Sequence, residues 1–168
     1  MGSYRSIFAP GLFKDRVAIV TGGGSGIGRC TAHELASLGA MVALVGRKPE
    51  KLAAVQAEIE AAGGVAQAYP CDIREEEQVR KTVAAVRDGA GRIDFLVNNA
   101  GGQFPAPLET ISQKGWETVV RTNLTGGFLM ARECYVQAMK PAALNGNAGA
   151  IVNIIADMWQ GMPPMGHS

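Results

Sequence analysis

A glycine-rich string near the start of the chain has the residue types and spacing of a phosphate-binding turn. It runs from Thr21 to Arg29 and reads TGGGSGIGR. Gly22 permits a tight turn, Gly26 opens the N-terminus of a following helix, and Gly28 lets that helix pack closely. Free N–H groups and the helix dipole favour an anion at such a terminus. A plain glycine-rich turn is the alternative. The residues predicted to take part are Gly22, Ser25, Gly26, Ile27 and Gly28.

A second apolar run ends in the basic pair Arg47 and Lys48. No Asp or Glu stands at this position, where a carboxylate would bind the 2′-hydroxyl of a ribose. The planar guanidinium of Arg47 suits a 2′-phosphate instead. The pattern therefore favours NADP(H) over NAD(H) as cofactor. The alternative is two solvated basic residues ahead of a helix.

Polar residues also follow the next two apolar runs. Asp72, beside Ile73, could accept a hydrogen bond from an adenine amino group. Equally, it could cap a helix that begins near Arg74, and one residue could do both. The string from Asn98 to Gly101 combines two amides that can lock a strand end with small residues that leave room for a flat ring. A stabilising turn is the alternative there. The predicted cofactor contacts in this string are Asn99, Ala100 and Gly101.

The elements that must position these residues alternate between apolar strands and helices. Strands are expected at 17–20, 41–45, 65–69, 93–97 and 150–155, and helices at 26–38, 49–62, 75–88 and 112–140. Strands that are apolar on both faces and alternate with helices predict an α/β fold, a Rossmann-type doubly wound parallel sheet. Right-handed crossovers favour the strand order 3-2-1-4-5, with a ligand crevice between strands 1 and 4. Residues 1–13 are expected to form an arm, and residues 14–168 one dinucleotide-binding domain.

Composition excludes several other classes of protein. The chain has 168 residues, 47% of them hydrophobic and 18% charged, with a net charge of +1. These values argue against a disordered chain and against nucleic-acid or membrane partners. The three cysteines form no CxxC pair, and the N-terminus has no apolar signal segment, so we expect reduced thiols and a cytoplasmic location. With only two histidines, His33 and His167, no metal site is expected.

Taken together, these strings resemble the short-chain dehydrogenase/reductase family. The matching strings are Thr21-Gly22-x3-Gly26-Ile27-Gly28, Asp72, Asn98-Asn99-Ala100-Gly101, and Asn123 within Arg121-Thr122-Asn123-Leu124-Thr125-Gly126. The resemblance implies an oxidoreductase, usually a homo-oligomer, that acts on a small-molecule substrate. It also implies that Asn123 kinks a long helix and holds a water in a proton relay. We therefore name Asn123 as a candidate catalytic residue.

The sequence departs from the family at the acid/base residues. The family uses a Ser after the fifth strand and a Tyr-x-x-x-Lys motif further on. Ala156 stands at the Ser position, the Tyr position falls at about Ser168, and no Tyr-x-x-x-Lys is present. We interpret Tyr135 as a packing residue. Asp157, the nearest polar group, is a second catalytic candidate that could orient substrate or water, or it could be a plain loop residue.

Two explanations remain open, a chain truncated after the fifth strand and an atypical subgroup. Several strings resemble the branch of peroxisomal trans-2-enoyl-CoA reductase and its bacterial relatives, some assigned to citronellol or citronellal oxidation. The first functional hypothesis is an NADP(H)-dependent reduction of an enoyl thioester or a related carbonyl or alcohol reaction. The alternatives are a terpenoid-type alcohol or aldehyde dehydrogenase and a non-catalytic cofactor-binding module. The strings that carry this resemblance are Ala9-Pro10-Gly11-Leu12, Gly101-Gly102-Gln103-Phe104, Lys114-Gly115-Trp116, Asn123-Leu124-Thr125-Gly126, Val152-Asn153-Ile154-Ile155 and His167-Ser168.

Overall fold

A computed structural model describes residues 6–156 of the chain, and its centre is one parallel β-sheet. The strands are β1 (Val17–Thr21), β2 (Met41–Gly46), β3 (Val65–Pro70), β4 (Phe95–Asn98) and β5 (Ala150–Asn153). Their order across the sheet is β3-β2-β1-β4-β5, so the predicted order is confirmed. All pairings are parallel, which places the carboxyl ends of the strands along one edge.

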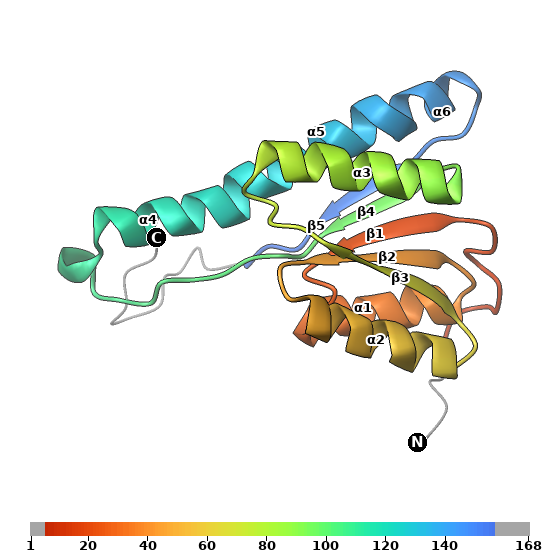
Figure 1. Cartoon of the computed structure of the whole chain (residues 1–168), viewed down its shortest axis with the longest axis horizontal. Helices are drawn as coiled ribbons and strands as arrows, with labels where there is room; N and C mark the ends of the chain where they lie inside the picture. The colour runs from red at the N-terminus through yellow and green to blue at the C-terminus, as the bar shows by residue number, and fades with distance from the viewer. Residues whose placement is uncertain (1–5, 157–168) are drawn as a thin grey trace.

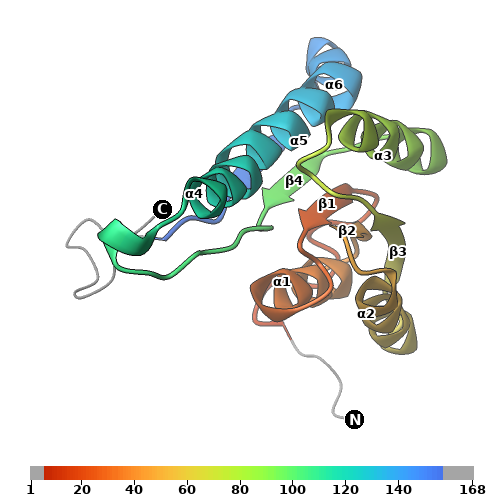
Figure 2. The ribbon, with the colours of Figure 1, turned by 60° about the vertical axis from the view of Figure 1, so that its left-hand side comes forward.

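Helices cover both faces of this sheet. They are α1 (Gly26–Ser37), α2 (Pro49–Ala61), α3 (Glu76–Ala90), α4 (Gln113–Val120), α5 (Gly127–Cys134) and α6 (Lys140–Leu144). Figure 1 shows α1 and α2 on one face and α3 with the long run from α4 to α6 on the other. Figure 2 shows the same three layers turned, with the sheet between the two helical layers. The doubly wound architecture is thereby confirmed.

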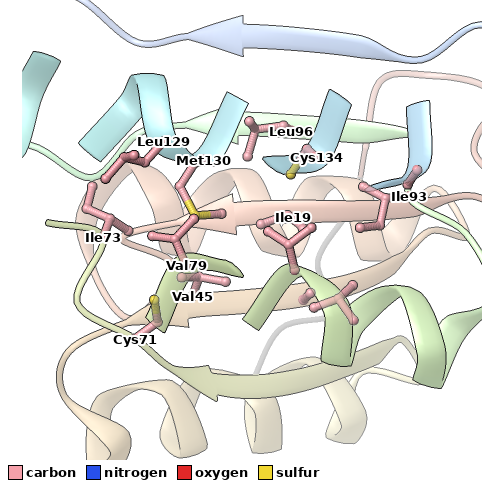
Figure 3. Packing of buried hydrophobic residues seen from close by; sticks show 14 of the residues in the cluster. Ile19, Val45, Cys71, Ile73, Val79, Ile93, Leu96, Leu129, Met130 and Cys134 are labelled. Carbon is pink, nitrogen blue, oxygen red and sulfur yellow. The ribbon is translucent and has the colours of Figure 1, made fainter. Parts of the chain in front are cut away.

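Two apolar clusters hold the layers together. Ile19 and Leu96 of the sheet pack beneath Val79 of α3 and Met130 of α5, as Figure 3 shows, and these four side chains are fully buried. A second cluster lies between the sheet and helices α1 and α2. β1 and β2 are buried on both faces because each has a strand on either side and helices above and below.

The long helix predicted over 112–140 forms, with two π-helical turns inside it. They are η2 (Arg121–Gly126) and η3 (Tyr135–Met139), and η1 (Leu108–Thr110) is a short 3-10 turn ahead of α4. At η2, a Cβ on Gly126 would lie 2.7 Å from the side chain of Ile73, so the helix backbone is in close contact with this residue of the loop after β3. Pro141 follows η3, and proline cannot donate a hydrogen bond within a helix. π-helical turns interrupt the regular hydrogen bonding of an α-helix and are frequent at functional sites.

Two features of the packing do not follow from the apolar pattern. The strand expected at 150–155 forms as β5, yet all four of its residues are exposed, with Val152 at 50%. It is an edge strand, and β4 is its neighbour in the sheet. Tyr135 is 51% exposed, so its interpretation as a packing residue is wrong. Among the described residues, no helix is long and apolar enough to cross a bilayer.

Candidate functional site

A cavity of about 310 Å³ lies at the carboxyl ends of the strands, where the predicted residues converge. A doubly wound sheet binds its ligands at this edge. Most of the residues predicted to bind a cofactor line the cavity, although they come from loops after four different strands. These residues are Gly22, Ser25, Arg47, Asp72, Ile73, Asn99, Ala100 and Gly101.

The turn after β1 has the backbone shape that its glycines predict. Gly22 has φ +69, and a Cβ there would lie 2.8 Å from Asn99 Nδ2. A Cβ on Gly28 would collide with the carbonyl oxygen of Gly22, so α1 packs directly on the turn. Around Gly26, by contrast, no atom of the described residues would lie within 4 Å of a Cβ. Ser25, the N-cap of α1, makes no side-chain cap bond, and the first turn of the helix carries no acidic residue. The open space and unpaired N–H groups fit an anion.

Thr21 fastens this turn to the loop after β4. Its buried Oγ1 accepts hydrogen bonds from the backbone N–H of Asn99 at 3.0 Å and of Ala100 at 2.9 Å. The Asn99 side chain donates in return to Thr21 O at 2.9 Å. The cavity floor between β1 and β4 is therefore built from cross-strand bonds. Ala100 and Gly101, the next residues of this loop, line the cavity.

Asn98 joins three elements beside the cavity. Its Nδ2 donates to Gly127 O of α5 at 3.0 Å and to Asn153 Oδ1 of β5 at 3.0 Å. Asn98 is buried, and its Oδ1 has no protein partner among the described residues. The amide thus holds the end of β4 against α5 and β5.

Basic side chains gather at the β2 and β3 end of the cavity. Arg47 and Lys48 line it together with Lys51 of α2. Within the described part of the chain, none of these three side chains forms a hydrogen bond or an ion pair. Three unpaired cations at one end of a cavity suit an anionic group such as a phosphate.

Asp72 lines the same cavity and is paired with Arg74. The Arg74 guanidinium donates to both carboxylate oxygens, with Nε at 2.8 Å from Oδ1 and Nη2 at 2.5 Å from Oδ2. These hydrogen bonds lower the pKa of Asp72, so the carboxylate stays charged. The alternative in which Asp72 caps the following helix is contradicted, because α3 begins at Glu76 with Glu75 as its N-cap. Asp72 instead closes a local turn by accepting from Arg74 N at 3.1 Å.

Asn123 lies in the π-helical turn η2 and clamps the loop after β4. Its Oδ1 accepts from Gly102 N at 3.0 Å, and its Nδ2 donates to Gly102 O at 2.7 Å. At this residue the regular α-helix gives way to a π-helical turn. The other catalytic candidate, Asp157, lies outside the described residues.

Several residues that line the cavity were not predicted as site residues from the sequence. Lys51 had a usable signal, because it stands three residues after Lys48 and shares its helix face. Arg74 follows Asp72 by two residues, a spacing that pairs side chains only when the loop turns back. Thr122 reaches the cavity because η2 turns toward it. The lining residues not predicted as site residues are Gly24, Gly46, Lys48, Lys51, Leu52, Cys71, Arg74 and Thr122.

Solved structures of similar proteins share this fold. The citronellol catabolism dehydrogenase of Pseudomonas aeruginosa PAO1 is 59% identical, with a TM-score of 0.87 over 95% of this chain and 64% of that one. A metagenomic short-chain oxidoreductase in complex with NADP is 39% identical, with a TM-score of 0.78 over 86% of this chain and 64% of that one. An NAD+-bound xylitol dehydrogenase is 36% identical, with a TM-score of 0.77 over 84% of this chain and 53% of that one.

Curated relatives include dehydrogenases and reductases. The 3beta-hydroxysteroid dehydrogenase of Mediterraneibacter gnavus is 37% identical over 88% of this chain and 51% of its own length. The peroxisomal 2,4-dienoyl-CoA reductase of Arabidopsis thaliana is 33% identical over 91% of this chain and 52% of its own length. The chain spans about half the length of these curated relatives. The short chain dehydrogenase family model matches residues 16–163. With its cavity, its glycine turn and these relatives, the chain belongs to the short-chain dehydrogenase/reductase family of oxidoreductases.

Proposed function

We propose that the protein is an NADP(H)-dependent oxidoreductase that transfers a hydride between nicotinamide and a small-molecule substrate. The observation that carries this proposal is the cavity itself. It joins an open glycine turn at the N-terminus of α1 to a rim of unpaired cations. The turn fits a pyrophosphate, and the small residues Ala100 and Gly101 leave room for the nicotinamide side. When bound, the cofactor would supply or accept the hydride, while the chain would bind the cofactor and orient it.

The preference for NADP(H) rests on the end of β2. Arg47, Lys48 and Lys51 line the cavity there, and no carboxylate stands ready for a ribose 2′-hydroxyl. One similar solved structure is in complex with NADP and another has NAD+ bound, so these likenesses favour neither cofactor. Our proposal therefore rests on the residues at the end of β2. In it, Arg47 donates to the 2′-phosphate through its planar guanidinium.

The preference is tested by measuring the affinity of the protein for NADPH and for NADH by titration calorimetry. The Arg47→Ala variant should bind NADPH about tenfold more weakly, because only NADPH has the 2′-phosphate that Arg47 would contact. Its affinity for NADH should be almost unchanged. Arg80→Ala is the matched control, since Arg80 is paired with Glu77 on α3 and does not line the cavity. Equal affinity of the unaltered protein for the two cofactors would contradict the preference.

For the substrate, we propose an acyclic apolar alcohol or its aldehyde. The relative that is 59% identical is named for citronellol catabolism. The loops after β4 and β5 expose the apolar side chains Phe104, Ile154 and Ile155, which suit a hydrocarbon chain. Oxidation of the alcohol would need a bound cofactor that takes up the hydride from the carbinol carbon and a base that takes up the hydroxyl proton. In our proposal, Asn123 holds a water on this proton path, and Asp157 orients substrate or water.

Reduction of an enoyl thioester is the second candidate. It is favoured by the likeness to a 2,4-dienoyl-CoA reductase. A hydride would then add at Cβ and a proton at Cα of the acyl chain. The cations that line the cavity lie at the adenosine end, and this speaks mildly against a phosphate-rich acyl carrier at the other end.

One assay separates the candidates. The purified protein is given NADP+ with citronellol, or NADPH with an enoyl-CoA, and the absorbance of the reduced nicotinamide is followed. Turnover of the alcohol alone would support the first proposal, and turnover of the enoyl thioester alone would support the second. Cofactor binding without turnover of either substrate would support a non-catalytic binding module. Normal turnover in Asp157→Ala would remove that residue from the mechanism.

A further inference from the structure

In the Asp72–Arg74 pair, hydrogen bonds from Arg74 occupy most of the acceptor positions of a carboxylate that lines the cavity. Both residues line the cavity, and their side chains are only 20% and 27% exposed. Oδ1 of Asp72 accepts from Arg74 N, the Nε–H of Arg74 is shared between Oδ1 and Oδ2, and Oδ2 also accepts from Arg74 Nη2, so three N–H groups point at the carboxylate. A carboxylate has about four acceptor positions, so the pair leaves room for about one further donor.

The loop that carries this pair is held from several directions. Gln78 of α3 accepts from Asp72 N at 3.0 Å. Arg121 of η2 donates to Glu75 Oε1 at 2.9 Å, and Ile73 packs against Gly126. With its backbone fixed in this way, the remaining freedom of Asp72 is the rotation of its side chain. The bidentate hydrogen bonding of the Arg74 guanidinium to the carboxylate restricts this rotation.

We infer that Arg74 is a positioning residue for cofactor recognition, fixing the Asp72 carboxylate so that its remaining acceptor position receives the amino group of adenine. This inference rests on the proposed function, since it needs a dinucleotide in the cavity. Neutral bases that lack an amino donor at that place would bind more weakly. Arg74 thereby sets the identity of the base, whereas Arg47 sets the affinity for the phosphate.

The test compares NADPH with reduced nicotinamide hypoxanthine dinucleotide phosphate, in which an oxygen replaces the adenine amino group. The unaltered protein should bind NADPH about tenfold more tightly than the hypoxanthine analogue, because a hydrogen bond to a charged acceptor is lost. Arg74→Ala and Asp72→Ala should both reduce this ratio to near one. The double variant should show no further change, because the two residues act as one unit.

Two further variants show whether the effect belongs to the geometry of the pair. Arg74→Lys keeps the positive charge but not the planar fork, and it should keep less than half of the discrimination. Arg80→Ala removes a similar fork from Glu77 outside the cavity and should leave the ratio unchanged.

The outcomes distinguish the inference from the function on which it rests. A protein that binds neither dinucleotide contradicts the proposed function. If NADPH binds and Arg74→Ala weakens both dinucleotides equally, the inference is overturned, because Arg74 then supports the cavity without reading the base. Full discrimination in Arg74→Lys would also overturn it, since a point charge would suffice.

Discussion

At the scale of single residues, the Thr21 hydroxyl is the centre of the site. It is fully buried, accepts from two backbone N–H groups of the loop after β4, and donates to Val97 O at 3.3 Å. A valine has nearly the same shape but offers no acceptor. The N–H groups of Asn99 and Ala100 would then lose their partner in a partly buried place.

We expect Thr21→Val to lower the free energy of unfolding by about 2 kcal/mol, because unsatisfied buried donors cost about 1–3 kcal/mol each. Urea denaturation followed by circular dichroism measures the loss. Thr21→Ser keeps the hydroxyl and should recover most of the stability, apart from the contribution of one methyl group. A valine variant as stable as the serine variant would show that the hydroxyl does not hold the loop.

Residue contacts could be predicted from the sequence where a motif fixes the backbone. Gly22 and Asn99 belong to such strings, and the structure places them against each other. The Asp72–Arg74 pair could not be predicted, because a spacing of two residues brings side chains together only in a particular turn. The exposure of Tyr135 was also missed, since the period of a helix does not say which of its faces meets the sheet.

At the scale of elements, the strand order follows from the alternation of apolar runs and helices, together with right-handed crossovers. The sequence does not indicate that β5 is exposed, because apolar residues read the same whether or not a helix covers them. It also does not show the π-helical turns. The turn η2 makes tertiary contacts that lie far apart in the sequence, with Gly126 against Ile73 and Asn123 hydrogen-bonded to Gly102.

The clamp in η2 gives a prediction about the loop after β4. Asn123→Ala should raise the exchange rate of the Gly102 amide hydrogen at least about fivefold, because a typical hydrogen bond contributes about 1 kcal/mol. Hydrogen exchange followed by NMR measures the rate. Asn145→Ala is the matched control on the same helical run, since the one side-chain hydrogen bond of Asn145 to the described residues goes to Pro141 O at its own helix end. Unchanged exchange at Gly102 would mean that the loop holds itself.

At the scale of the whole molecule, charge has opposite arrangements at the two ends of the sheet. The carboxyl ends face unpaired cations in a cavity, which leaves that end ready for an anion. At the amino ends, the Asp94 side chain is buried and its carboxylate accepts hydrogen bonds from several donors. Arg16 Nη1 donates to its Oδ1 at 2.9 Å, and Val17 N donates to its Oδ2 at 2.9 Å. Arg92 donates to both oxygens. The amino end is therefore closed by ion pairs that tie β4 to β1.

The Asp94 cluster makes the stability of the fold depend on pH in a defined direction. Burial raises the pKa of Asp94, but hydrogen bonds from Arg92, Val17 and Arg16 outweigh burial, so the pKa in the folded protein lies below its usual value. A lowered carboxylate pKa stabilises the fold fully above the pKa of the unfolded chain, about 3.9, and the contribution disappears as the pH falls through the folded value.

Asp94→Asn should therefore lower the free energy of unfolding by about 3 kcal/mol near neutral pH, the lower end of the cost of breaking a buried pair. The lower end applies because the side chains of Arg16 and Arg92 are each 40% exposed and can turn to water. Urea denaturation from about pH 7 to about pH 3 measures the difference between the two proteins, which should be constant above about pH 5 and shrink below it. The comparison cancels the titration of the other carboxylates that both proteins share. A difference that stays constant down to the most acidic point would mean that the charge of Asp94 does not stabilise the amino end of the sheet.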